Sequence, residues 1–305
     1  YFLRGFNLDH GTDFATQVDG MPVNLRSHGH GQGYSDLNFL IPEMVERLVY
    51  RKGTYYADVG DFSSAGSASF ELAERLENQR VLIGLGSEGY ARGLALGGTS
   101  GERAALTYGL EAQSFDGAWT DIDEAVRKRN LIVKTTFDVG DGQAHATVMA
   151  YRNRWNSPDQ VPARAVDSGL IDALGSLDTD LGGASERRSF SAGWRGSSGI
   201  GEIEVNAYAI DYELDLWSNF TYFLDDPVDG DEFRQRDQRS VYGFDLSDAL
   251  SFDRWRVRGG ISGRRDDIDH VGLCRTVARR CVTPIRDDDV VEDSLGVWLD
   301  AEYRF

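Results

Sequence analysis

A polar segment near the N-terminus, residues 25–36 (LRSHGHGQGYSD), combines two histidines with three glycines. His28 and His30 are separated by one residue, and two imidazoles at that spacing can share a Cu(II), Ni(II) or Zn(II) ion, with His10 or Asp36 completing the set. The alternative is that both imidazoles hydrogen-bond to an organic ligand or to neighbouring loops. Because glycine weakens both helix and strand, we expect an irregular loop here.

A second segment, residues 54–66, carries further groups that can contact a ligand. Its two tyrosines either stack on a ligand or pack against a neighbouring surface, and its carboxylates accept hydrogen bonds. Over both segments, the candidate ligand-binding residues are Arg26, His28, His30, Gln32, Tyr34, Asp36, Tyr55, Tyr56 and Asp61.

Composition and motifs exclude several classes of function. The formal net charge of -18 argues against nucleic acid as a partner. No run of about 18 apolar residues is present, which excludes a membrane-spanning helix. The sequence also lacks a Gly-x-Ser-x-Gly elbow, a His-Glu-x-x-His zinc motif and a phosphate-binding Gly-Lys-Ser/Thr loop, so we do not expect an enzyme.

The two cysteines, Cys274 and Cys281, lie seven positions apart in an Arg- and Asp-rich segment. They form neither a Cys-x-x-Cys redox motif nor two paired zinc-binding clusters. A local disulfide in an oxidising compartment is favoured over two free thiols.

Beyond about residue 79, apolar and polar side chains alternate, the period that places one set on each face of a strand. For example, Leu106, Tyr108 and Leu110 alternate with Thr107 and Glu111. The predicted strands lie near 80–88, 90–98, 103–116, 129–138, 143–153, 187–195, 201–217, 239–248, 255–265 and 293–305.

The connections between these strands alternate in length. Short turns near 98–103, 139–143, 195–201 and 249–254 alternate with long polar connections. The expected long connections are 117–128, 154–186, 218–238 and 266–292. The connection 86–90 occupies the first position of this series but is short. Bacterial outer-membrane barrels alternate in this way, with strands that are apolar toward lipid and polar toward the lumen. Ten strands with an open edge would be part of a larger closed barrel.

The strand at 201–217 departs from the pattern, because its apolar residues change face at Tyr208. A bulge or a strand that rises above the membrane would each explain the change. Inward-facing arginines at 187, 256, 258 and 264 either balance carboxylates of the N-terminal region or line an anion path.

Two acidic segments, 225–233 and 286–293, are candidates for Ca²⁺ binding. They lack the ordered ligand spacing of a calcium loop, so solvated surface is the default interpretation.

The first 76 residues lack this hairpin rhythm and carry four short blocks instead. In order, these are Arg4-Gly5-Phe6, then Val18-Asp19-Gly20-Met21-Pro22-Val23-Asn24, then Ile41-Pro42-Glu43-Met44-Val45-Glu46-Arg47-Leu48, then Arg51-Lys52-Gly53. The series resembles the plug domain of TonB-dependent outer-membrane receptors. We expect residues 17–23 to form two short strands around an Asp-Gly turn, and 41–47 to begin a short helix at Pro42.

The resemblance implies an all-β transmembrane barrel with a small α+β plug domain. Residues 1–76 would be the plug, and residues 77–305 about ten of the 22 antiparallel strands expected in this family. Because the resemblance also calls for a TonB box and further strands, we expect the chain to be a fragment. In this family, the loops that match 25–36 and 54–66 touch the ligand.

The implied function is active import across the bacterial outer membrane, with energy from TonB. The cargo would be an iron–siderophore or other metal complex, a cofactor or a saccharide, with no certain resident cofactor. Partners would be TonB, outer-membrane lipid and lipopolysaccharide, and the ligand. Two alternatives stay open: a passive porin-like channel, and a soluble β-rich adhesin or lectin.

Overall fold

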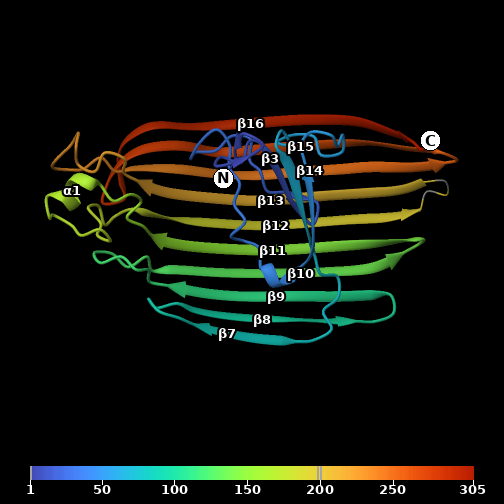
Figure 1. Cartoon of the computed structure of the whole chain (residues 1–305), viewed down its shortest axis with the longest axis horizontal. Helices are drawn as coiled ribbons and strands as arrows, with labels where there is room; N and C mark the ends of the chain where they lie inside the picture. The colour runs from blue at the N-terminus through green and yellow to red at the C-terminus, as the bar shows by residue number, and fades with distance from the viewer. Residues whose placement is uncertain (1, 198, 200) are drawn as a thin grey trace.

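The structure is a computed structural model that describes residues 2–197, 199 and 201–305. Ten consecutive strands form one antiparallel sheet, the large sheet, in which neighbours in sequence are neighbours in space (Figure 1). The strands are β7 (Arg80–Leu85), β8 (Ala91–Ser100), β9 (Ala104–Phe115), β10 (Val126–Val139), β11 (Gly142–Asn156), β12 (Gly182–Ser197), β13 (Gly201–Ser218), β14 (Phe233–Phe252), β15 (Trp255–Val277) and β16 (Arg280–Tyr303). The ten predicted strands are therefore confirmed, and β7 and β16 are the edges.

The connections also alternate as predicted, with one exception. Three long connections, 116–125, 157–181 and 219–232, lie at one end of the large sheet, here called the long-loop end (Figure 1). The opposite end, the short-turn end, carries the turns after β8, β10, β12 and β14. In the turn after β12, residues 198 and 200 lie outside the described residues.

The prediction of a long loop over 266–292 is wrong. There β15 and β16 continue as strands to a two-residue turn, Ala278 and Arg279, with φ of 48° and 61°. Two central residues at positive φ are typical of a tight hairpin turn that matches strand twist. The acidic and basic side chains that suggest a loop instead pair across the strands, as His270 and Asp287 do at 3.0 Å.

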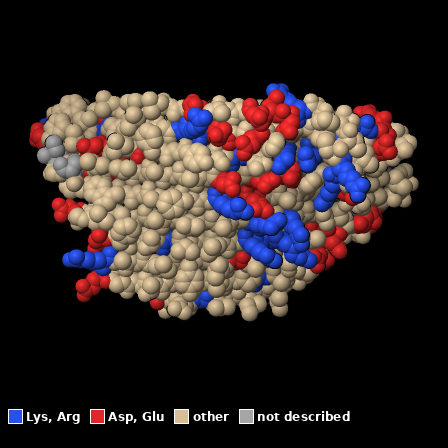
Figure 2. Space-filling view, turned by 180° about the vertical axis from the view of Figure 1, so that it is seen from behind, with Lys and Arg blue, Asp and Glu red and all other residues tan. Residues whose placement is uncertain are grey.

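The outer face of the large sheet is mainly apolar, whereas its inner face buries both polar and apolar side chains. On β9, Leu110 is 49% exposed whereas Glu111 is 5% exposed, and Thr107 is fully buried. Seen from behind, the outer face has a broad area with few charged residues toward the short-turn end, and charges gather toward the long-loop end (Figure 2). This distribution is the reverse of that in a water-soluble sheet.

The N-terminal region, residues 2–76, lies against the inner face of the large sheet (Figure 1). It contains a two-stranded ladder and a four-stranded sheet of order β4-β3-β6-β5, in which β3 and β6 are parallel. The strands are β1 (Phe2–Leu3), β2 (Phe6–Asn7), β3 (Phe14–Val18), β4 (Met21–Pro22), β5 (Val45–Lys52) and β6 (Gly66–Leu72). The predicted turn between β3 and β4 is confirmed, with Asp19 and Gly20 at φ of 46° and 76°.

The prediction of a helix over 41–47 is wrong in its extent. The prediction that this region is α+β is also wrong. Only a single 3-10 turn forms, η1 (Pro42–Met44), and Val45 already begins β5. The Ala73 N–H donates to the Met44 carbonyl at 2.8 Å, and Val45 pairs with Leu72, so pairing with β6 replaces the next helical turn. The α-helix in the described residues is α1 (Ala163–Asp167), in the connection after β11. No helix among them is long and apolar enough to span a membrane.

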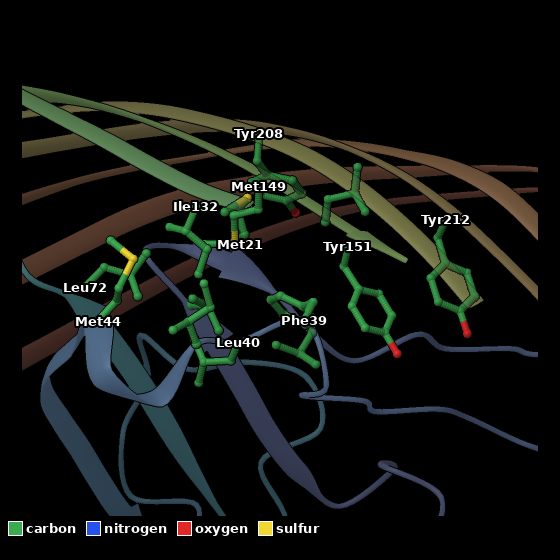
Figure 3. Close-up of a cluster of buried hydrophobic side chains, with 14 of the residues drawn as sticks. Met21, Phe39, Leu40, Met44, Leu72, Ile132, Met149, Tyr151, Tyr208 and Tyr212 are labelled. Atoms are coloured by element: carbon green, nitrogen blue, oxygen red, sulfur yellow. The ribbon is translucent and has the colours of Figure 1, made fainter. Parts of the chain in front are cut away.

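The main hydrophobic core lies between the N-terminal region and the large sheet. Figure 3 shows Met21, Phe39, Leu40, Met44 and Leu72 near Ile132, Met149, Tyr151, Tyr208 and Tyr212. Fully burying one such side chain stabilises the packed state by about 1.5–3 kcal/mol. The N-terminal region is therefore bound to the sheet by a shared core.

This core explains the change of face in β13. The register of β13 is unbroken against both β12 and β14, so the bulge interpretation is wrong. Val205 points outward and is 40% exposed, whereas Tyr208, Ile210 and Tyr212 belong to the core shared with the N-terminal region. The second apolar set thus faces inward because the N-terminal region covers it.

Candidate functional site

The histidine segment folds into a narrow loop closed by two backbone hydrogen bonds. The Leu25 N–H donates to the Tyr34 carbonyl at 2.9 Å, and the Tyr34 N–H donates to the Leu25 carbonyl at 3.1 Å. Residues 25–34 contain neither a helix nor a named strand, as predicted. We call this segment the His loop; it extends from the N-terminal region onto β13 and β14.

His28 is the buried centre of the His loop. Its side chain is fully buried and stacks on Tyr34, with ring centroids 4.1 Å apart and 9° between the planes. The His30 backbone N–H donates to Nδ1 at 3.1 Å, which leaves the proton of the neutral ring on Nε2. Nε2 then donates to the Tyr212 hydroxyl at 3.1 Å. Burial, followed by the positive charge of Arg239, lowers the pKa of His28 well below its ordinary value.

The tip of the His loop contacts β14 directly. The Gly29 N–H donates to Asp237 Oδ2 at 2.9 Å, and His30 Nδ1 lies 3.0 Å from Gln235 Oε1. A Cβ at Gly29 would lie 2.3 Å from the Arg236 carbonyl oxygen, so only glycine allows this approach. Half-buried His30 is also near His10, with ring centroids 6.2 Å apart.

Below the His loop, four charged side chains form a buried network of balanced charge. Arg239 binds Asp237 through two bonds of 2.7 Å and reaches Asp266 at 3.4 Å. Arg264 binds Asp266 at 2.5 and 2.7 Å and donates to the Asn24 carbonyl at 2.9 Å. Two cations therefore match two anions, which is the condition under which buried charges are tolerated. The network fixes the wall on which the His loop rests.

The other predicted residues of the first segment divide by exposure. Gln32 is exposed, whereas Tyr34 and Asp36 are half-buried. Burial raises the pKa of both, and Asp36 also accepts hydrogen bonds from the backbone and side chain of Asn38 at 2.8 and 2.6 Å. Arg26 is half-buried and points to the second segment.

The second segment contacts the first through one ion pair. Arg26 Nε lies 3.0 Å from Asp61 Oδ2. Tyr55 is 75% exposed and Tyr56 is 38% exposed, and the Arg51 guanidinium lies over the Tyr56 ring at 4.9 Å. Asp58 pairs with Arg51 at 2.7 Å. The structure thus brings the two predicted segments together and leaves both tyrosines accessible.

The residues of the N-terminal blocks have structural roles. Asp19 forms a buried ion pair with Lys134 of β10 at 3.1 Å and accepts hydrogen bonds from the Leu72 N–H and the Thr147 hydroxyl, at 2.9 and 3.0 Å. Gly20 lies against β13, where the Asn206 side chain donates to its carbonyl at 3.0 Å.

The remaining block residues lie in turns or ion pairs. Pro42 begins η1, and Glu43 binds Arg92 of β8 at 2.6 and 2.9 Å. Arg47 pairs with Glu71, and Glu46 accepts the Glu74 N–H at 3.4 Å. Arg4 and Gly5 form the turn before Phe6, and Gly53 ends β5; the two glycines and Arg4 have positive φ.

The inward arginines contact the N-terminal region mostly through carbonyl oxygens. Arg187 donates to the Pro22 carbonyl at 3.2 Å and lies 4.5 Å from the Phe39 ring centroid, while Arg264 donates to Asn24. Arg258, in contrast, pairs with a carboxylate of the N-terminal region: its Nη1 lies 3.9 Å from Asp58 Oδ2.

Cys274 and Cys281 form the predicted disulfide. It lies near the tip of the β15–β16 hairpin, within paired strands and not within the loop that the sequence suggests.

Sequence reasoning missed the partners of the His loop on the large sheet. Tyr212, Gln235 and Asp237 lie about 200 positions beyond His28 and His30. The sequence contains one indication of these contacts, the change of apolar face in β13. It marks the part of β13 that the N-terminal region covers.

No protein-family model and no curated protein matches this chain. Solved structures of outer-membrane transporters and receptors share its fold. The unliganded ferric citrate transporter FecA matches with a TM-score of 0.73 at 12% identity, over 98% of this chain and 46% of that one. The copper transporter OprC matches with a TM-score of 0.70 at 13% identity, over 95% and 44%. The alcaligin outer-membrane receptor FauA from Bordetella pertussis matches with a TM-score of 0.62 at 15% identity, over 99% and 45%. The chain thus spans less than half the length of these three proteins.

Proposed function

We propose that this chain is the N-terminal part of a TonB-dependent outer-membrane receptor that imports a scarce nutrient. Residues 1–76 act as the plug, and residues 77–305 contribute the first strands of a larger closed barrel. The observation that carries the proposal is the polarity of the large sheet: its apolar outer face is open, while its inner face buries polar side chains together with an apolar core under the N-terminal region. Such a sheet suits lipid outside and a plug within.

The charged residues of the outer face also favour a location in the outer membrane. Arg129 and Arg152 lie directly opposite each other on β10 and β11, and Arg188 follows on β12. Arg152 and Arg188 are both about 70% exposed and share one carboxylate, Glu186, at 2.8 and 3.3 Å. Arg188 also reaches Asp211 at 3.6 Å, so the three arginines face two carboxylates. The remaining positive charge beside the apolar area suits the phosphates of lipopolysaccharide.

The ligand is captured by the exposed groups of the two N-terminal segments, with Gln32, Tyr55, Tyr56 and Asp61 available for direct contact. An organic complex that carries a metal, a cofactor or a saccharide fits these hydrogen-bonding and aromatic groups. Direct metal binding by His28 and His30 stays a prediction. It would require the metal to displace the Tyr212 hydroxyl or the His30 N–H from His28. No covalent chemistry is part of this function.

One experiment separates this function from its two alternatives. The whole receptor, and a variant that lacks residues 2–76, would be reconstituted into planar bilayers, and their conductances compared. We expect a low conductance for the intact receptor and a large, steady conductance for the variant, because the plug closes the lumen. A passive porin would conduct in both forms, and a soluble adhesin would not insert.

Energy coupling has its own test. Candidate ligands would first be identified by native mass spectrometry of the detergent-extracted receptor. Uptake of the identified ligand should then fall to background in cells that lack TonB or are treated with a protonophore. Uptake that persists in both would contradict the coupling.

A further inference from the structure

Arg187 is a buried cation that forms no ion pair within the described residues. It lies on the inner face of β12 and is 4% exposed. Its guanidinium donates to the Pro22 carbonyl at 3.2 Å and lies 4.5 Å from the Phe39 ring centroid. Arg239, in contrast, is bound to Asp237 at 2.7 Å. A buried charge without a counter-charge is costly, so the surroundings of Arg187 need an explanation.

A small cavity lies beside this guanidinium, between β12 and the N-terminal region. Its volume is about 10 Å³, which is room for one water or one monoatomic ion. Arg187 and Ser185 of β12 line it, together with Phe39 of the N-terminal region and Tyr151 of β11. Figure 3 shows Phe39 beside Tyr151, whose hydroxyl points away from the large sheet. Both walls of the cavity are therefore built by this chain.

Two hydrogen-bond donors in the lining of this cavity have no partner. Within the described residues, neither Arg187 Nε nor Ser185 Oγ forms a hydrogen bond, and both atoms are buried. Ser185 as a whole is only 2% exposed. Buried polar atoms without partners are rare and commonly mark a bound ion or water. Because a guanidinium can only donate, the cavity requires an acceptor.

Asp36 also lines the cavity, but it forms no ion pair with Arg187 within the described residues. Its Oδ1 accepts hydrogen bonds from the backbone and side chain of Asn38, at 2.8 and 2.6 Å. Burial raises the pKa of Asp36, although the Asn38 hydrogen bonds and the charge of Arg187 act in the opposite direction. The raised pKa favours the neutral carboxyl, which leaves the charge of Arg187 unbalanced.

We propose that Arg187 and Ser185 bind a chloride ion in this cavity. A water would accept both hydrogen bonds but leave the positive charge unbalanced, whereas chloride accepts both and balances the charge. Carboxylates and phosphate are too large for a volume of about 10 Å³. The ion joins the N-terminal region to β12 beside the His loop. This role is independent of the transported nutrient.

The first test locates the ion directly. The whole receptor would be crystallised from detergent with sodium bromide in place of chloride, and anomalous diffraction would be recorded at the bromine edge. We expect an anomalous peak at hydrogen-bonding distance from Arg187 Nε and Ser185 Oγ. Electron density at that position without an anomalous signal would identify a water and overturn the proposal.

The second test measures binding in solution. The melting temperature of the whole receptor would be followed as chloride replaces gluconate at constant ionic strength. An ion that binds only the folded state stabilises it, so we expect the melting temperature to rise with chloride and then to saturate. Bromide should act in the same way. A melting temperature that is independent of halide concentration would contradict the proposal.

Two variants and a matched control assign the effect to this cavity. Arg187→Gln should abolish the chloride dependence. Ser185→Ala should need about fivefold more chloride for half of the effect, because one neutral hydrogen bond is lost, and it keeps the test decisive if Arg187→Gln does not fold. Ser189→Ala, on the same face of β12 but outside the cavity, should respond as the wild type does. An unchanged response in both Arg187→Gln and Ser185→Ala would overturn the assignment.

A third variant, Asp36→Asn, separates chloride from Asp36 as the counter-ion of Arg187. If chloride balances Arg187, the variant should bind chloride at least as tightly as the wild type, because a carboxyl that could repel the ion is gone. If Asp36 balances Arg187, the variant should lose stability at every chloride concentration. That second result would sink the proposal.

Discussion

His28 donates a hydrogen bond from Nε2 to the hydroxyl of Tyr212, 3.1 Å away, across 184 positions of sequence. Both side chains are buried, and the Tyr34 ring stacks on His28 from the other side. The contact joins the His loop to β13. It also means that the imidazole at the centre of the motif holds the N-terminal region against the large sheet.

Docking of the His loop should depend on Gly29. In Gly29→Ala, the new methyl group would meet the Arg236 carbonyl at 2.3 Å, and the strain should cost about 1–3 kcal/mol. We expect the loop to detach and tryptic cleavage after Arg26 to accelerate. Gly93→Ala is the matched control, because a Cβ there meets nothing within 4 Å. Equal cleavage of the two variants would argue against tight docking.

The buried ion pair of Asp19 and Lys134 should be essential to the seating of the N-terminal region. Asp19→Asn leaves the ammonium of Lys134 buried without a counter-charge, and we expect a loss of about 3–5 kcal/mol. The measurement is the urea concentration at which the N-terminal region unfolds in the detergent-solubilised receptor.

Two further variants give this measurement its reference points. The double variant Asp19→Asn/Lys134→Met should recover part of the loss, because no unpaired charge stays buried. Arg47→Ala breaks an exposed pair with Glu71 and should cost less than about 1 kcal/mol. An Asp19→Asn midpoint close to that of Arg47→Ala would contradict the assigned role.

Acid should loosen the His loop. Burial lowers the pKa of His28, so above about pH 6.5 the residue is neutral in both the folded and the unfolded state and carries no pH-dependent penalty. Below that pH the unfolded chain takes up a proton that folded His28 resists, and the free energy of unfolding falls as pH decreases.

The pH effect is measured as the melting temperature of the receptor at pH 7.5 and pH 5. We expect the decrease to be larger for the wild type than for His28→Asn, which has no imidazole to protonate. His30→Asn is the comparison variant, since half-buried His30 lies in the same loop. An unchanged decrease in His28→Asn would assign the acid sensitivity to other groups.

The outward arginines should bind lipopolysaccharide phosphate. Replacing Arg152 by Ala removes a charge-assisted contact, and we expect about tenfold weaker binding of lipid A, measured by native mass spectrometry after delipidation. Arg103→Ala, at the exposed turn of the opposite end, should leave binding unchanged. Dephosphorylated lipid A should bind the wild type as weakly as the variant; if it binds as tightly as lipid A, the phosphate assignment is wrong.

Local sequence patterns determined much of this fold. The alternation of apolar and polar residues predicts ten strands, because the two faces of each strand lie in different surroundings. The turn at Asp19 and Gly20 is predictable because Asp and Gly tolerate the positive φ that such a turn requires. The disulfide of Cys274 and Cys281 was likewise predictable, since its partners lie seven positions apart. These features depend on neighbours along the chain.

The tertiary structure decided which face of each strand is covered and what each polar group contacts. Tyr208 and Tyr212 face inward only because the N-terminal region packs there, and His28 is buried only because β13 and β14 receive it. Pairing also turned the charged segment 266–292 into strand and stopped η1 after one turn. Each of these outcomes depends on contacts between residues far apart in sequence, and these contacts outweigh local propensity. The change of apolar face at Tyr208 is a trace of them in the sequence, but it does not identify the partners.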